Sequence, residues 1–341
     1  MLNVVLMRLR LVLLAVLLGA GLAPSSAWAI SLMDPLNIAQ AVDQNVVKLG
    51  DGVPFGDLPR LKLDVYAPQN PSGDAPVVMF IYGGAWSRGE RGEYEFAGRA
   101  LAARGFVAVV PDYRVVPAAR YPDFLYDNAK AVKWIEDNIA RYGGDANRLF
   151  LAGHSAGAYN AVMLGLDSSF LRDMGATVKI RGVAGLAGPY DFYPFEFGEV
   201  TQAFGDAPNP QGTQPINLVT ADAPPMFLAT GTSDPIVRPR NTGVLAAKLK
   251  QAGIWVTEKY YDGIGHMEAV TSMGAMLRWR APVLDDMVFF FSSFGAFPSG
   301  QPRVAVVPEP AAGVEEPVAG VTESMQDIAK QMDALLSPLS Q

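Results

Sequence analysis

One pentapeptide, residues 153–157 (GHSAG), follows the pattern G-x-S-x-G that presents a nucleophilic serine. The pattern has this meaning only where it joins a buried strand to a helix, because the serine then lies on a sharp, exposed turn. The apolar run 149–152 precedes it, and the small-residue segment 156–166 follows it as a predicted helix. Ser155 is therefore the predicted nucleophile.

A serine nucleophile needs a base, and the whole chain holds only two histidines. His154 adjoins the nucleophile, and its side chain is expected to point away from Ser155. His266 lies in a glycine-containing loop directly after the predicted strand 255–261. His266 is therefore the predicted base.

A carboxylate must hold the tautomer of that base and stabilise its charged form. Asp234 follows the predicted strand 226–230, one strand before the histidine. The resulting chain order of serine, aspartate and histidine is the order of α/β-hydrolases. Asp262 is the main rival, although it reads as a surface turn residue, and Glu258 is a weaker one.

Acyl transfer also needs hydrogen-bond donors for the oxyanion. The backbone N–H of Ala156 is the first predicted donor, and a second is expected from the small residues 83–85, which follow a buried run. Trp86, His154 and Tyr190 are the predicted substrate contacts. Tyr190 belongs to an aromatic stretch that could line an apolar pocket or equally form a cap packed on its core.

The elements that must position these groups are strands alternating with helices, which predicts parallel βαβ units. The predicted strands are 61–66, 77–82, 106–110, 149–152, 183–186, 226–230 and 255–261. The predicted helices are 93–104, 123–141, 156–166 and 239–251, and a weaker helical pattern, interrupted by Pro282, covers 273–291. Strand 61–66 alternates as an edge strand does, whereas residues 31–57 show weak periodicity. Residues 190–225 form a possible cap insertion over the carboxyl ends of the strands, where such sheets bind ligands.

The N-terminal residues 1–29 have the pattern of a secretory signal peptide. Arg8 and Arg10 supply its positive region, 11–22 is apolar, and 27–29 (AWA) fits a cleavage site. The alternative is an uncleaved N-terminal anchor. We expect an exported protein, periplasmic or secreted, with no stable membrane span after cleavage.

Composition excludes several classes of protein. The chain lacks cysteine, so it has no disulfide scaffold, thiol nucleophile or thiolate metal site. Its formal charge of −7 offers no basic stripe for nucleic acid. Nothing indicates a metal or a cofactor. Residues 30–297 are the predicted catalytic domain, 298–322 a Pro-, Ala- and Glu-rich linker, and 323–341 a short amphipathic tail.

Several motifs follow one another in a set order: 82–86 (YGGAW), 112–114 (DYR) with Pro117, 142–145 (YGGD) with Arg148, the serine pentapeptide, 231–237 and 265–266. Together they resemble the carboxylesterases of the BD-FAE and hormone-sensitive-lipase-like group. The resemblance covers about residues 61–291. It implies an α/β-hydrolase fold with a mostly parallel eight-stranded sheet and helices on both faces. It also implies cofactor-free hydrolysis of a small-molecule ester by the triad above.

The resemblance further implies oxyanion donors at Gly84 and Ala85. Tyr82 departs from the group, because many members have histidine there, so the side-chain support of this loop must differ. The same triad would also serve an amidase, a formamidase or a peptidase. A non-catalytic envelope protein that uses the fold for binding is the alternative outside enzymes.

Overall fold

The computed structural model describes residues 37, 43, 45–70, 74–196 and 198–297. The predicted signal peptide (1–29), the linker (298–322) and the tail (323–341) lie outside the described residues. Within the described part, none of the helices combines the length and apolar character needed to span a bilayer.

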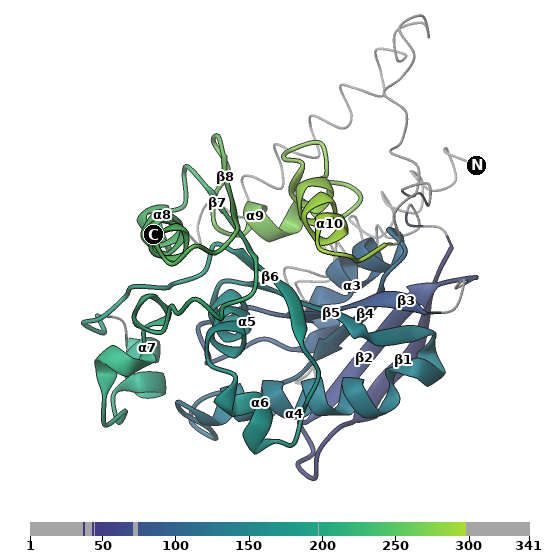
Figure 1. The fold of residues 1–341 in the computed structure, drawn as a ribbon, viewed down its shortest axis with the longest axis horizontal. Helices are drawn as coiled ribbons and strands as arrows, with labels where there is room; N and C mark the ends of the chain where they lie inside the picture. The colour runs from purple at the N-terminus through teal and green to yellow at the C-terminus, as the bar shows by residue number, and fades with distance from the viewer. Residues whose placement is uncertain (1–36, 38–42, 44, 71–73, 197, 298–341) are drawn as a thin grey trace, which may run out of the picture. The chain divides into compact units, whose positions relative to one another are not determined.

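A single sheet of eight strands organises the described residues, in the order β1-β2-β4-β3-β5-β6-β7-β8 (Figure 1). The strands are β1 Val46–Pro54, β2 Lys62–Pro68, β3 Ala75–Ile81, β4 Val107–Pro111, β5 Gly144–His154, β6 Ile180–Leu186, β7 Met226–Gly231 and β8 Val256–Tyr261. β2 pairs antiparallel with β1 and β4, and every other pairing is parallel. This confirms the predicted mostly parallel sheet.

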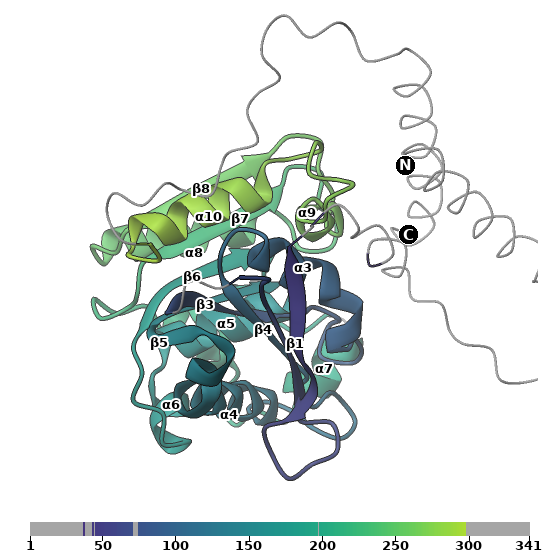
Figure 2. The ribbon, with the colours of Figure 1, turned by 90° about the vertical axis from the view of Figure 1, so that its right-hand side faces the viewer.

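Helices cover both faces of this sheet. The α-helices are α3 Glu95–Ala102, α4 Asp123–Asn138, α5 Ala156–Leu166, α6 Ser169–Asp173, α7 Gly198–Phe204, α8 Arg240–Gln251, α9 Glu268–Thr271 and α10 Val283–Ser293. Short 3₁₀ segments are η3 Arg91–Tyr94, η4 Ile139–Tyr142, η5 Pro210–Thr213 and η6 Pro215–Asn217. α3 and α10 pack together on one face, while α4, α5 and α6 lie on the other (Figures 1 and 2).

The predicted edge position of strand 61–66 is wrong. β2 lies between β1 and β4, and β1 is the true edge. The sequence conceals β1 because it contains Gly50 and Gly52, and because its pairing with β2 shifts register on both sides of Gly50. The polar positions of β2 are therefore not all solvated: Asp64 is 1% exposed.

Of the weaker helical pattern at 273–291, only the part after Pro282 forms a helix. Turns occupy the region around 274–280, and α10 begins only at Val283, directly after Pro282. Proline lacks a backbone N–H and so suits the start of a helix better than its interior. The run predicted at 149–152 extends to the longer strand β5.

The parallel core strands set the place of the site. β3, β5, β7 and β8 run in the same direction, so their carboxyl ends meet along one edge of the sheet. The glycine loop (residues 83–89), Ser155, Asp234 and His266 each follow one of these ends. Loops at such an edge are where open α/β sheets bind ligands.

Candidate active site

Ser155 occupies a strained turn between β5 and α5. Its backbone has φ 54° and ψ −122°, a conformation that side-chain-bearing residues rarely adopt. Its amide donates to the carbonyl of Leu186 at 2.8 Å. A Cβ added at Gly153 would lie 2.3 Å from the Gly157 carbonyl oxygen, and one at Gly157 would lie 2.0 Å from that of Ile81. The motif's glycines are therefore required by close backbone approach.

Three predicted side chains meet in one hydrogen-bonded row. His266 Nε2 lies 2.9 Å from Ser155 Oγ, and His266 Nδ1 lies 2.7 Å from Asp234 Oδ2. The other oxygen of Asp234 accepts the amides of Ile236 and Val237, each at 2.9 Å. Because a carboxylate only accepts, Nδ1 carries the proton and Nε2 is free to accept from the serine hydroxyl. The arrangement suits removal of a proton from Ser155.

The rival acids lie elsewhere. Asp262 is exposed and accepts a hydrogen bond from the hydroxyl of Thr232 at 3.2 Å. Glu258 forms an ion pair with Lys250 and accepts from Tyr260. The carboxylate that the structure brings to His266 is that of Asp234.

The glycine loop holds the predicted oxyanion donors in an unusual conformation. Gly84 has φ +127°, and the next residues, Ala85 and Trp86, have φ 50° and 56°. A Cβ at Gly84 would lie 2.2 Å from the carbonyl oxygen of Arg88, so no side chain fits there. Two successive positive φ angles outside glycine cost free energy and persist only where surrounding contacts enforce them.

Three backbone amides at this place have no hydrogen-bond acceptor within the described part of the chain. The amides of Gly84 and Ala85 find no acceptor among the described residues. Ala156 is the first residue of α5, where an amide has no acceptor inside the helix. The loop lies against the nucleophile, since a Cβ at Gly83 would come within 3.0 Å of Ser155 Cβ. Free donors beside a nucleophile can accept a developing negative charge.

Tyr82 anchors the glycine loop where the resembling esterases often have histidine. Its hydroxyl donates to Asp112 Oδ1 and accepts from Arg60 Nη2, each at 3.1 Å. Arg60 also donates to the carbonyl of Gly89, at the far end of the loop. The Tyr82 ring stacks on Tyr113 with centroids 4.7 Å apart. Burial and the charge of Asp112 raise the pKa of the Tyr82 phenol, so it stays protonated.

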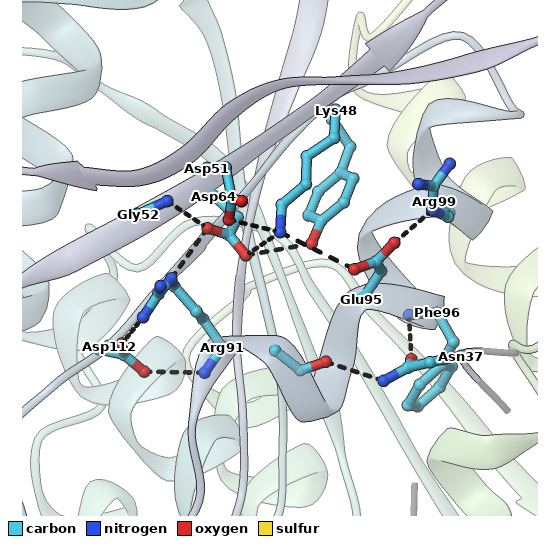
Figure 3. Close-up of polar contacts among 12 residues, drawn as sticks. Asn37, Lys48, Asp51, Gly52, Asp64, Arg91, Glu95, Phe96, Arg99 and Asp112 are labelled. Carbon is cyan, nitrogen blue, oxygen red and sulfur yellow. Dashed lines mark hydrogen bonds and ion pairs between the residues drawn. The ribbon is translucent and has the colours of Figure 1, made fainter. Parts of the chain in front are cut away.

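An ion cluster, consisting of Lys48, Asp51, Asp64, Arg91 and Asp112, supports this anchor (Figure 3). Lys48 Nζ lies 2.9 Å and Arg91 Nε 2.8 Å from the two oxygens of Asp64. Arg91 Nη1 reaches Asp112 at 2.6 Å. Burial lowers the pKa of both cations, but their carboxylate partners outweigh it and raise the pKa of each. The cluster joins β1 and β2 to the residue that holds Tyr82.

The three predicted substrate contacts are buried. Trp86 is 2% exposed, His154 1% and Tyr190 0%. Side chains with so little exposed surface offer a substrate almost nothing to contact in this conformation, so the structure does not support direct contact. The cause is local packing: both ring nitrogens of His154 face protein atoms, and the Tyr190 ring fills the space that side chains at Gly185 and Gly188 would need.

Trp86 instead joins the glycine loop to α5 and to aromatic residues of the segment 190–225. Its indole N–H donates to Asn160 Oδ1 on α5 at 3.1 Å. Its ring packs against Phe204 of α7, with centroids 4.7 Å apart, and against Phe192 at 6.0 Å. The aromatic stretch therefore contributes core packing beneath the loop. The sequence left open whether these aromatic residues line a pocket or pack on the core, because aromatic composition alone does not reveal which rings are covered.

Among the described residues, no group of three or more histidine, cysteine or acidic side chains is placed to hold a metal ion.

The sequence model of the BD-FAE family matches residues 63–249. The isoprenylcysteine alpha-carbonyl methylesterase ICME of Arabidopsis thaliana is 35% identical over 144 residues, which cover 41% of this chain and 34% of that protein. Esterase LipC of Mycobacterium tuberculosis is 33% identical over 204 residues, covering 54% and 50%. The chain thus spans only a third to a half of the length of these relatives.

Solved structures share the fold. A truncated carbohydrate esterase from gut microbiota superimposes with a TM-score of 0.64 at 19% identity, covering 73% of this chain and 95% of that one. A thermostable esterase from Pseudomonas putida gives a TM-score of 0.61 at 23% identity, covering 78% and 90%. These similarities confirm the predicted α/β-hydrolase fold.

Proposed function

The chain belongs to the BD-FAE family, and we propose that it is a serine carboxylic-ester hydrolase acting on small to medium esters. The observation that carries this proposal is the hydrogen-bonded row Asp234–His266–Ser155 beside three backbone amides that have no acceptor in the described ranges. Relatives named as esterases support an ester as the substrate.

The first step forms an acyl-enzyme. His266 Nε2 takes the proton of Ser155 Oγ as the oxygen attacks the ester carbonyl carbon. The carboxylate of Asp234 holds the Nδ1–H tautomer and stabilises the imidazolium that results. The carbonyl oxygen, now negative, is held by the N–H groups of Gly84, Ala85 and Ala156. The C–O bond to the alcohol breaks, and the alcohol leaves with the proton from His266.

The second step releases the acid. His266 takes a proton from water, the hydroxide attacks the acyl carbonyl, and the bond to Ser155 Oγ breaks as the serine regains its proton. The same amides hold the second oxyanion. Every proton thus passes through the imidazole of His266. The contacts fit this path, because the Ser155 hydroxyl and the Asp234 carboxylate lie at opposite nitrogens of that ring.

Substitution of the nucleophile tests the proposal. We expect Ser155→Ala to lower kcat for p-nitrophenyl acetate by about 10⁴-fold or more, because no other group replaces the serine. A fluorophosphonate probe should label the wild-type protein once and leave this variant unlabelled. Ser168→Ala, at an exposed serine just beyond α5, is the matched control and should behave as wild type.

Wild-type turnover by the folded Ser155→Ala variant would contradict the proposal. Circular dichroism and the melting temperature establish that the variant is folded. A matched panel of esters and amides with the same acyl groups then checks the reaction class. Preference for the amides would replace the esterase assignment by an amidase.

A further inference from the structure

The second histidine of the chain has a partner at each ring nitrogen. His154 Nε2 lies 3.0 Å from the backbone carbonyl oxygen of His266. His154 Nδ1 lies 3.3 Å from the hydroxyl of Tyr94. That hydroxyl oxygen also accepts a hydrogen bond from the amide of Gly83, at 3.4 Å. The contacts therefore form one continuous path from the glycine loop to the base.

Only one set of proton positions satisfies all of these contacts. The His266 carbonyl can only accept, so Nε2 of His154 must carry a proton. In a neutral ring Nδ1 then accepts, and the Tyr94 O–H donates to it while the oxygen receives the Gly83 N–H. Burial, together with the neighbouring His266, holds the pKa of His154 well below its usual value, so the neutral ring is the stable form.

We propose that His154 and Tyr94 are positioning residues. They hold the base and the oxyanion donors at fixed positions relative to the nucleophile. The chain of hydrogen bonds Gly83–Tyr94–His154–His266 is called the His154 relay below. The proposal rests on the esterase function proposed above, because it assigns the relay a role in that reaction.

The relay joins segments that follow three different strands. Gly83 comes after β3 and immediately precedes the donor Gly84, His154 ends β5 and precedes Ser155, and His266 follows β8. Because β3 and β8 are not adjacent in the sheet, no ladder hydrogen bond fixes these two loops relative to each other. The relay supplies that connection. Small errors in the placement of reacting groups cost large factors in rate.

The positioning role of His154 requires an uncharged imidazole ring. The rings of His154 and His266 lie 4.8 Å apart between centroids. A positive charge on His154 would oppose the imidazolium that forms on His266 as Ser155 attacks. Glu93 and Arg88 are the other charged groups that act on Tyr94, and they act in opposite directions on its pKa.

Nuclear magnetic resonance tests the relay independently of ester hydrolysis. The chain has two histidines, so ¹⁵N-labelling of the imidazoles gives two assignable side chains. We expect one of them to stay neutral and protonated at Nε2 through the pH range in which an ordinary histidine titrates, and His154→Gln to remove that signal. A His154 ring protonated at Nδ1, or one that titrates like a free histidine, would overturn the proposal.

Kinetics tests the positioning role. Tyr94→Phe removes one hydroxyl and keeps the ring, and we expect it to lower kcat for p-nitrophenyl acetate about tenfold, the worth of one hydrogen bond, with little change in KM. Tyr126→Phe is the matched control, because that hydroxyl bonds Asp173 at the surface. It should leave both constants unchanged.

Replacing His154 by glutamine or asparagine should partly preserve the activity that His154→Phe loses. The side chain of glutamine places an N–H near the position of Nε2, while that of asparagine places an oxygen near the position of Nδ1. Each keeps one half of the relay, so both variants should retain more activity than His154→Phe. A Tyr94→Phe variant with lowered melting temperature but wild-type kcat would show a merely structural role and overturn the proposal. Absence of ester hydrolysis by the wild type would defeat the proposed function, while the tautomer measurement would still decide the relay.

Discussion

Two buried carboxylates of this chain are satisfied in opposite ways. Asp64 is 1% exposed and contacts two permanent cations, Lys48 and Arg91. Asp234 is 4% exposed and contacts two backbone amides and the imidazole of His266, none of which carries a permanent charge. Both solutions meet the requirement that a buried charge be hydrogen-bonded.

This difference between the partners of Asp64 and Asp234 distinguishes a structural carboxylate from one proposed to take part in the reaction. At Asp64 the negative charge is matched at all times, so the ion cluster holds β1, β2 and the anchor of Tyr82 in place. In the proposed mechanism, the charge of Asp234 is matched fully only when His266 becomes an imidazolium. An interaction that strengthens as the reaction proceeds accelerates it, whereas a constant one does not.

The largest expected effect is on the catalytic side of this comparison. Asp234→Asn should lower kcat by about 10⁴-fold, because the amide favours the wrong tautomer of His266 and cannot stabilise its positive charge. Its melting temperature should stay close to that of the wild type, since the amide oxygen can still accept from Ile236 and Val237. Ester hydrolysis and thermal unfolding measure the two quantities. Asp262→Asn is the control, and a comparable loss there would reverse the assignment.

The second largest expected effect is a loss of stability when the structural carboxylate, Asp64, is replaced. Asp64→Asn should lower the free energy of unfolding by about 3 kcal/mol, the lower end for a broken buried pair, because each cation keeps another carboxylate. Those remaining partners are Asp51 for Lys48 and Asp112 for Arg91. Urea unfolding measures the loss, and kcat of the folded variant should be nearly unchanged. A large fall in kcat at unaltered stability would mean that the two carboxylates do not differ in role.

The smallest effect is a pH dependence of stability from His154. Its pKa is depressed in the folded protein below the ordinary 6.5, so the unfolded chain binds a proton there that the folded chain rejects. The contribution of the uncharged His154 to the free energy of unfolding is fully present above pH 6.5 and is lost as the pH falls. Wild-type stability should decline relative to His154→Gln by about 1.4 kcal/mol per pH unit below this value. Parallel stability curves for the two proteins would refute a buried neutral His154.

The proposed triad was accessible from the sequence for a physical reason. Parallel strands bring their carboxyl ends to one edge, so residues that follow separate strands become neighbours without any detailed packing information. Ser155, Asp234 and His266 each follow such a strand, and the scarcity of histidine left few choices for the base. The structure brings these three side chains within hydrogen-bond distance.

The supporting residues were not accessible in this way. Asp64 alternates with apolar neighbours as a solvated residue would. Lys48 of β1, a strand hidden by its glycines, and Arg91 of η3 are the cations that contact it. Tyr94 lies at the start of a helical segment and looks like an ordinary core aromatic residue. Trp86, His154 and Tyr190 were expected at the substrate, but burial depends on which side chains cover them, and that is decided by tertiary packing.

Tyr82 has a consequence for the conditions under which the protein can work. A histidine at this place would gain or lose a proton near neutral pH, and the hydrogen bonds that hold the glycine loop would change with it. Burial and the charge of Asp112 raise the pKa of the Tyr82 phenol, so its proton stays in place through acid and mildly alkaline media. The proposed oxyanion donors thus rest on a phenol that keeps its proton at pH values where a histidine in the same place would titrate.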